Sequence, residues 1–157
     1  MARRSIADIE KIWSNVEGVK KLSDRAIGFG PFKVGMDGLL TWIPVVGTAY
    51  SVGAAGWLLI QAAQAKASPS TFARMLAYLG VDSATTAVGE VVWGVADVVD
   101  LFFQGHALAA GALQKDIEST HWVEANEREA KASGDHERHL ADMRADSSKR
   151  RIVYLHD

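Results

Sequence analysis

The chain has 157 residues, a hydrophobic content of 48% and a formal net charge of −2 at pH 7. This length predicts one domain with a modest core, and the near-neutral charge argues against a protein that binds nucleic acid through a general basic field. The sequence contains no cysteine, which excludes disulfides, thiolate metal ligands and cysteine nucleophiles.

Residues 1–30 predict an amphipathic N-terminal helix. Ser5 and Asp8 have the spacing of a capping box variant, and Ile6, Ile9 and Ile12 begin an apolar series at helical spacing. The opposite face of this helix is charged. The pattern favours a helix that packs on its own protein, and the alternative is a helix that lies among lipid headgroups.

Residues 31–114 predict a membrane-embedded domain. The run from Gly38 to Ala65 contains no Lys, Arg, Asp, Glu or His, and a spanning helix needs roughly 20 mostly apolar residues. Pro44 and Gly47 interrupt this run, so we expect either a kinked span or a re-entrant hairpin. A second segment, about Thr71 to Phe103, is expected to repeat this arrangement after a polar turn in which Ser70 or Thr71 caps the next helix.

Small residues follow one side of the first apolar segment. They are Gly47, Ser51, Gly53, Ala55 and Gly56. Small side chains allow two helices in lipid to approach closely. The sequence therefore predicts a helix-packing strip, which meets either the protein's own second hairpin or another copy.

Carboxylates in the apolar region form the candidate polar site, which comprises Asp37, Asp82, Glu90, Asp97 and Asp100. In apolar surroundings each carboxylate needs a donor or a raised pKa. Glu90, Asp97 and Asp100 share one face if a single helix carries them, and they would then line a proton or cation path or bind a partner. In the alternative interpretation Asp37 and Asp82 cap helices, and the other three meet solvent, the tail or a partner.

Residues 115–157 predict a charged, partly disordered cytoplasmic tail with a helix, a break at Ser133 and Gly134, and a second weak helix. Glu127 and Lys131 have the spacing of an i, i+4 ion pair. His121, His136 and His139 lie in this tail, but their surroundings are ordinary for a charged segment. We predict no metal site there.

The motifs around the apolar segments resemble the bacterial and fungal family called domain of unknown function 4112, over about Leu22 to Leu113. The residues that match its first repeat are Gly35, Asp37, Ile43, Pro44 and Gly47, and those that match its second are Arg74, Met75, Leu76, Asp82, Asp97 and Asp100. Thr48 replaces an expected Asp, and Trp93 replaces an expected Pro. The resemblance implies a small membrane-associated helical protein and supplies no substrate and no catalytic residue.

These observations predict an all-α fold: a small helical membrane protein with two apolar hairpins or kinked spans, an amphipathic N-terminal helix and a charged helical tail. The expected function is a non-catalytic structural or accessory role in a bacterial inner membrane, with both termini cytoplasmic because basic flanks stay inside. Two alternatives remain open, a small ion- or proton-conducting membrane protein and a soluble helical binding domain.

No hydrolase, nucleotide-binding or zinc-peptidase motif occurs in the sequence. We therefore expect no enzymatic activity, no cofactor and no nucleic-acid partner. The expected partners are the lipid bilayer and either further copies of the chain or a larger membrane complex.

Overall fold

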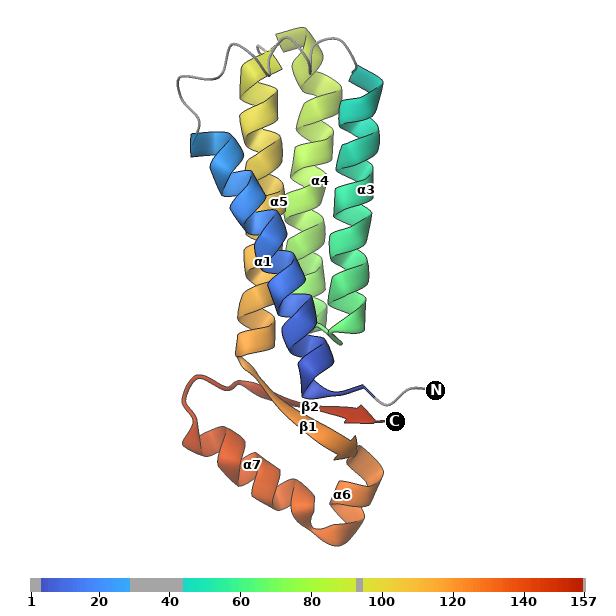
Figure 1. Cartoon of the computed structure of the whole chain (residues 1–157), viewed down its shortest axis with the longest axis vertical. Coiled ribbons are helices and arrows are strands. Elements are labelled where there is room, and N and C mark those ends of the chain that lie inside the picture. The colour runs from blue at the N-terminus through green and yellow to red at the C-terminus, as the bar shows by residue number, and fades with distance from the viewer. Residues whose placement is uncertain (1–3, 29–43, 93–94, 157) are drawn as a thin grey trace.

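The computed structural model describes the backbone of residues 4–28, 44–92 and 95–156, and the side chains of residues 4–21, 52–80 and 104–156. Four long helices lie side by side: α1 (Ile6–Gly28), α3 (Pro44–Gln64), α4 (Pro69–Val92) and α5 (Val95–Glu118). At one end of them lies a smaller unit formed by β1 (Thr120–Asn126), α6 (Glu127–Ser133), α7 (Asp135–Ala145) and β2 (Arg151–His156) (Figure 1).

Helix α1 begins with the capping box that the sequence predicts. The Ser5 backbone N–H donates to Asp8 Oδ2 at 2.9 Å, and the Asp8 N–H donates to Ser5 Oγ at 3.3 Å. Ile9, Ile12 and Val16 are buried on one side of the helix, as their helical spacing requires. The predicted amphipathic helix is therefore confirmed, and it packs on its own protein.

Helix α5 lies at the centre of the bundle and packs extensively along α4 and α1, whereas α3 makes far fewer contacts. The main core gathers buried side chains from all four helices, among them Val16, Leu58, Met75 and Leu113, together with Leu155 from β2. Burial of these side chains joins the sheet to the bundle.

The turn between α3 and α4 ends one helix and starts the next within four residues. Lys66 has a positive φ of 44°, the Ala67 N–H donates to the Ala62 carbonyl, and the Lys66 N–H donates to the Ala63 carbonyl. This is a Schellman motif with lysine in place of the usual glycine. The cap of α4 is Ser68, whose Oγ accepts from the Thr71 N–H at 3.3 Å, and Pro69 takes the first helical position.

The two strands pair in parallel, with Thr120 opposite Arg151 and Val123 opposite Tyr154. Helices α6 and α7 connect them. Trp122 and Leu155 pack with the bundle core, whereas Val123 and Tyr154 form a second cluster with Ala130 of α6. The sheet therefore lies between the bundle and the α6–α7 layer, with both faces covered, as parallel strands generally require.

The predicted all-α class is wrong, because the charged tail contains this parallel sheet. Its strands carry short β-branched and aromatic runs, HWV and IVYL, which favour strands when a partner covers them. The predicted break is confirmed: α6 ends at Ser133, and Gly134 has φ 84°. The predicted ion pair is also present, with Lys131 Nζ 2.6 Å from Glu127 Oε1.

The predicted membrane-embedded hairpins or kinked spans are also wrong. Among residues 4–28, 44–92 and 95–156, no helix is long and apolar enough to cross a bilayer. Helix α3 has no charged residue, but glycines and the polar residues Thr48, Ser51 and Gln61 interrupt its apolar side chains, whereas a span needs roughly 20 mostly apolar residues.

Candidate functional site

The predicted carboxylate site falls on separate elements. Asp37 lies outside the described residues. Asp82 and Glu90 belong to α4, whereas Asp97 and Asp100 belong to α5, so Glu90 does not share one helix with the last two. The side chains of these four residues also lie outside the described set.

The predicted packing strip lies on α3. Pro44 is the first residue of this helix and Gly47 lies in its first turn, and the side chain of Ser51 is outside the described residues. Ala55 packs against the core. An added Cβ at Gly53 or Gly56 would meet nothing within 4 Å, so these two glycines are open rather than pressed against another helix of the chain.

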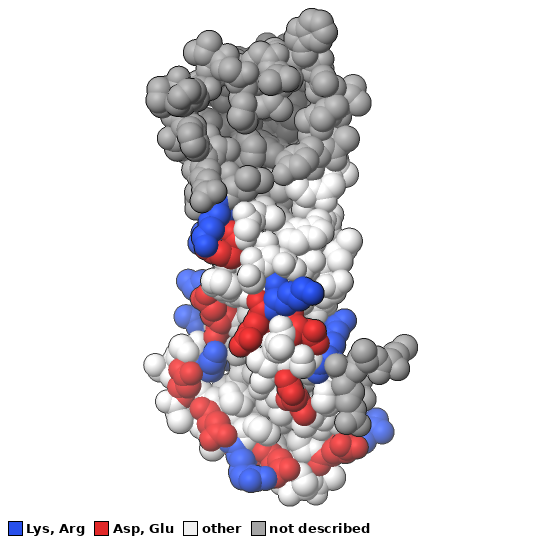
Figure 2. Space-filling model, in the orientation of Figure 1, with Lys and Arg blue, Asp and Glu red and all other residues white. Residues whose placement is uncertain are grey.

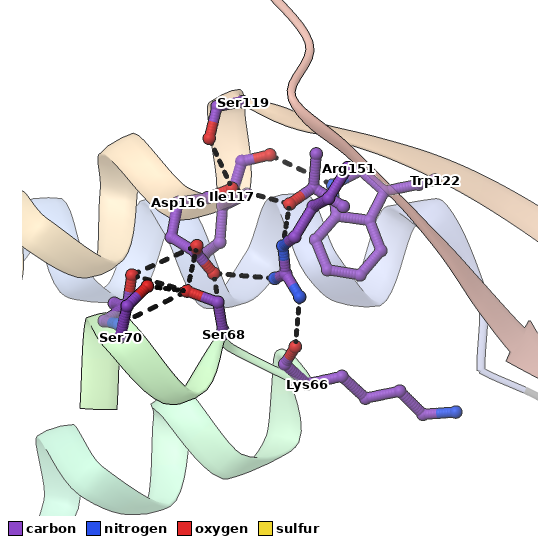
Figure 3. Close-up of polar contacts among 10 residues, drawn as sticks. Lys66, Ser68, Ser70, Asp116, Ile117, Ser119, Trp122 and Arg151 are labelled. Carbon is purple, nitrogen blue, oxygen red and sulfur yellow. Dashed lines mark hydrogen bonds and ion pairs between the residues drawn. The ribbon is translucent and has the colours of Figure 1, made fainter. Parts of the chain in front are cut away.

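Among the described side chains, the most extensive polar network lies where the bundle meets the sheet, around Asp116 near the end of α5 (Figure 3). Asp116 is buried, with 8% of its surface exposed. Its Oδ1 accepts from Ser68 Oγ at 2.8 Å and Thr71 Oγ1 at 3.1 Å. Its Oδ2 accepts from the Ser68 N–H at 3.0 Å and Arg151 Nη2 at 2.6 Å.

The guanidinium of Arg151, at the start of β2, donates hydrogen bonds to three partners. Besides Asp116, Nε donates to Thr120 Oγ1 at 2.9 Å and Nη1 donates to the Lys66 carbonyl at 3.0 Å. Thr120 is fully buried, and its hydroxyl donates to the Asp116 carbonyl at 2.7 Å. Figure 3 shows the Lys66 carbonyl directed at Arg151 while its ammonium points away from Asp116.

A carboxylate offers about four lone-pair positions, and four protein donors occupy those of Asp116. The network therefore leaves no acceptor for a substrate. It joins the α3–α4 turn, the end of α5, and both strands, so we call Ser68, Thr71, Asp116, Thr120 and Arg151 the junction network. Sequence reasoning missed it because its two charged members are 35 residues apart.

Three histidines and a tyrosine form a second cluster, between α7 and the sheet. His136 Nδ1 lies 2.9 Å from the Tyr154 hydroxyl. The ring of His139 lies 5.7 Å from that of His121 and 6.3 Å from that of Tyr154, measured between centroids. Burial raises the pKa of the Tyr154 hydroxyl. These contacts join α7 to the sheet. Within the described part of the chain, no group of three or more His, Cys, Asp or Glu is placed to hold a metal ion.

The third feature is the outward side of α3. At helical spacing it presents residues that are small or aliphatic, which we call the α3 face: Val52, Gly53, Gly56, Ile60 and Ala63. Val52 is 67% exposed and Ile60 is 55% exposed. Helix α3 contains no Lys, Arg, Asp, Glu or His. In Figure 2 the visible charged side chains gather over the lower bundle and the C-terminal unit, while the described surface above them, on the side of α3, is mostly uncharged.

Comparison with known proteins identifies one family. The model of the family described as Domain of unknown function (DUF4112) matches residues 12–117. No curated protein and no solved structure matches the chain. The matched range includes Asp116 but ends before β1, so Arg151 reaches the junction network from outside it.

Proposed function

Because the chain belongs to the family Domain of unknown function (DUF4112), whose description names no activity, we propose a function from the structure itself. The protein is a non-catalytic assembly module, and copies of the chain associate through the α3 face. The observation that carries this proposal is the exposure of Val52 and Ile60 on a helix without any charged residue.

An exposed apolar surface without charge is typical of an interaction site. A water-facing helix normally carries polar or charged residues on its outer side. Helix α3 has no charged residue at all, and among the described residues it makes fewer contacts with the other long helices than α1, α4 or α5 does. A partner that covers its outer side would bury Val52 and Ile60 and strengthen the attachment of α3.

The spacing within the α3 face favours a second copy as this partner. Val52, Gly56 and Ile60 lie four residues apart, on one line along the helix. If two α3 helices cross in antiparallel orientation at Gly56, Val52 of each copy meets Ile60 of the other. Two-fold interfaces require this self-complementarity.

The glycines support the same geometry. Gly53 and Gly56 have open space where a side chain would stand, and a residue without a Cβ allows another backbone to approach closely. The interface also needs no matching charge, because the α3 face carries none.

The occupancy of the junction network supports a non-catalytic role. Asp116 is a buried carboxylate, the type of group that often serves as an acid or base, but its oxygens accept four hydrogen bonds from the protein. Active-site groups must instead be able to reach substrate.

Sedimentation equilibrium tests the proposal. The unmodified chain should form dimers, and Ile60→Lys should shift it to monomers while the far-ultraviolet circular dichroism stays unchanged. The matched control is Leu108→Lys on α5, because Leu108 is 53% exposed and Ile60 is 55% exposed. A monomeric parent protein, or equal dissociation by both substitutions, would contradict self-association through α3.

A further inference from the structure

Helix α7 is attached to the sheet through histidines and buries no apolar side chain of its own. Among the described residues, α7 has no buried residue and belongs to neither hydrophobic cluster, whereas α6 contributes the buried Ala130. His136 and His139 make side-chain contacts from α7 to the sheet. Imidazole ordinarily changes its charge between about pH 5 and 8, so the attachment of α7 involves groups that can respond to pH.

The rings of His121 and His139 face each other across the boundary between β1 and α7. Their centroids lie 5.7 Å apart, with the ring planes tilted by 50°. Both residues are only half-buried, so both can exchange protons with water. If both rings are protonated, two like charges lie at this short distance, and each disfavours the charge of the other. The arrangement with α7 closed on the sheet therefore opposes the second proton.

The contact of His136 does not have this sensitivity. Its Nδ1 lies 2.9 Å from the Tyr154 hydroxyl. A hydroxyl can donate to a neutral ring nitrogen and can accept from a protonated one, so this hydrogen bond can form in either charge state of the ring. The part of the attachment that protonation disturbs is therefore the pair formed by His121 and His139.

The carboxylates nearest to these rings on neighbouring segments already have partners. On α6, Glu127 interacts electrostatically with His136, but it forms an ion pair with Lys131 at 2.6 Å. After α7, Asp146 interacts with His121 and already accepts two hydrogen bonds from the turn that follows it. Both carboxylates are exposed, and the attraction between exposed charges is weak in water.

The charged groups of α7 itself are also exposed or paired. Asp142 lies one turn after His139 and is exposed, and Asp135 forms an ion pair with Arg138. The remaining charged residues of this helix, which are exposed as well, are Glu137 and Arg144. None of these groups is a buried counter-charge for two protonated rings, so the repulsion within the pair remains.

We propose that the His121–His139 pair is a pH-sensitive switch, and that its double protonation releases α7 from the sheet and uncovers Tyr154. In the released arrangement the two rings are apart, so this state binds the second proton more readily than the closed state. Falling pH therefore favours release, and rising pH favours closure. Helix α7 has 11 residues, a length that is marginal in water without packing, so its helical hydrogen bonds are lost on release.

Amide hydrogen exchange in the full ¹⁵N-labelled chain measures this release. The observed exchange rate of each α7 amide, compared with its intrinsic rate at the same pH, gives the ratio of closed to released molecules. One additional bound proton changes this ratio by up to about tenfold per pH unit. Between about pH 7.5 and 5.5 we expect the protection of the central α7 amides to fall at least about tenfold relative to that of the central α5 amides.

Two substitutions assign the response to the pair. His121→Gln removes one of its charges and leaves His139 in place on α7, so the protection of α7 should no longer fall with pH. The matched control is His156→Gln on β2, because His156 is also half-buried but contacts the Arg4 carbonyl instead of the pair. This control should show the same fall as the unmodified chain.

Constant protection of α7 across this pH range in the unmodified chain would overturn the proposal, and so would an equal fall in α5, which would indicate global unfolding. An undiminished fall in His121→Gln would also overturn it, because the response would then belong to another group. If His121→Gln does not fold, His139→Gln removes the same pair from the side of α7. Helix α3 contains no Lys, Arg, Asp, Glu or His, so association through the α3 face does not produce this response.

Discussion

Asp116 and Arg151 show how single residues connect the two parts of the molecule. Asp116 belongs to the helical bundle and Arg151 to the strand that follows α7. Their ion pair has an N–O distance of 2.6 Å, with the side chains 8% and 25% exposed, respectively. Removing one partner from such a pair leaves the other partly buried without its counter-charge, which is strongly destabilising.

Arg151→Met should therefore lower the free energy of unfolding by about 2–3 kcal/mol, a range reduced from that of fully buried pairs because Arg151 retains some contact with water. Urea denaturation measures this change. Arg150→Met is the matched control, since Arg150 is exposed and such surface substitutions usually change stability by no more than about 0.5 kcal/mol. Equal effects of the two substitutions would show that the junction network does not stabilise the fold.

Asp8 makes the stability of the protein dependent on pH. Hydrogen bonds from the backbone and side chain of Ser5 lower the pKa of Asp8 below its ordinary value of 3.8. A lowered pKa in the folded state adds stability above pH 3.8 that is lost as the pH falls through the folded-state pKa.

Asp8→Asn should accordingly lower the thermal midpoint at neutral pH, and its difference from the unmodified chain should shrink in acid as the parent Asp8 becomes protonated. Thermal unfolding across a pH series measures the difference. Glu10→Gln removes another exposed charge from the first turns of α1 without removing a cap. A pH-independent difference for Asp8→Asn would refute the contribution of its charge.

At the scale of elements, the helices differ in the caps and packing contacts that stabilise them. Helix α1 has a side-chain cap and a buried apolar side, and α5 is covered by both α1 and α4. Helix α3 is attached through Leu58 and Ala62, together with Ala65 directly after its end, and its outer side retains exposed Val52 and Ile60. Contacts among the described residues therefore leave these two aliphatic side chains of α3 uncovered.

The substitution Gly56→Ala should have opposite effects on the stability of the monomer and on the association of two copies through α3. Alanine in place of a helical glycine with free space around it should stabilise the monomer by roughly 0.5–1 kcal/mol, and Gly18→Ala in α1 should do the same, because neither added Cβ meets an atom within 4 Å. Only Gly56→Ala should weaken dimers. Urea denaturation of the dilute monomer measures the change in stability, and sedimentation at higher concentration measures the change in dimerisation. If Gly56→Ala destabilised the monomer while Gly18→Ala did not, the space around Gly56 would not be free as the structure shows.

At the scale of the whole molecule, the sheet is shared by two hydrophobic clusters. Leu155 belongs to the bundle core, and its neighbour Tyr154 belongs to the cluster with Val123 and Ala130. Lys66 Nζ also donates to the Tyr154 carbonyl at 3.1 Å. These contacts join the C-terminal unit to the bundle, so the two parts should unfold together.

Hydrogen exchange tests this cooperativity. The central amides of β1, β2 and α5 should exchange with the same free energy, equal to that of global unfolding. In Arg151→Met the strand amides should exchange faster relative to those of α5, because the junction network no longer connects the two parts. Independent exchange of the strands in the unmodified chain would mean that the C-terminal unit opens by itself.

The sequence by itself determined the features that depend on near neighbours. The Ser5–Asp8 cap, the apolar side of α1, the Glu127–Lys131 pair and the break at Gly134 each involve residues within a few positions of one another, and the structure confirms them. The family could also be predicted, because its motifs are local patterns.

Only the tertiary structure decided the sheet, the junction network and the place of α3. Thr120 pairs with Arg151, and Asp116 receives donors from Ser68 and Arg151, so these features depend on segments that are distant in sequence. Parts of the charged C-terminal segment form strands because the bundle covers one face of the sheet and α6 covers the other. Strand formation depends on such burial more than on the intrinsic strand propensity of the residues. The sequence shows that helix α3 carries no charge, but which of its sides stays exposed depends on the helices that pack against it.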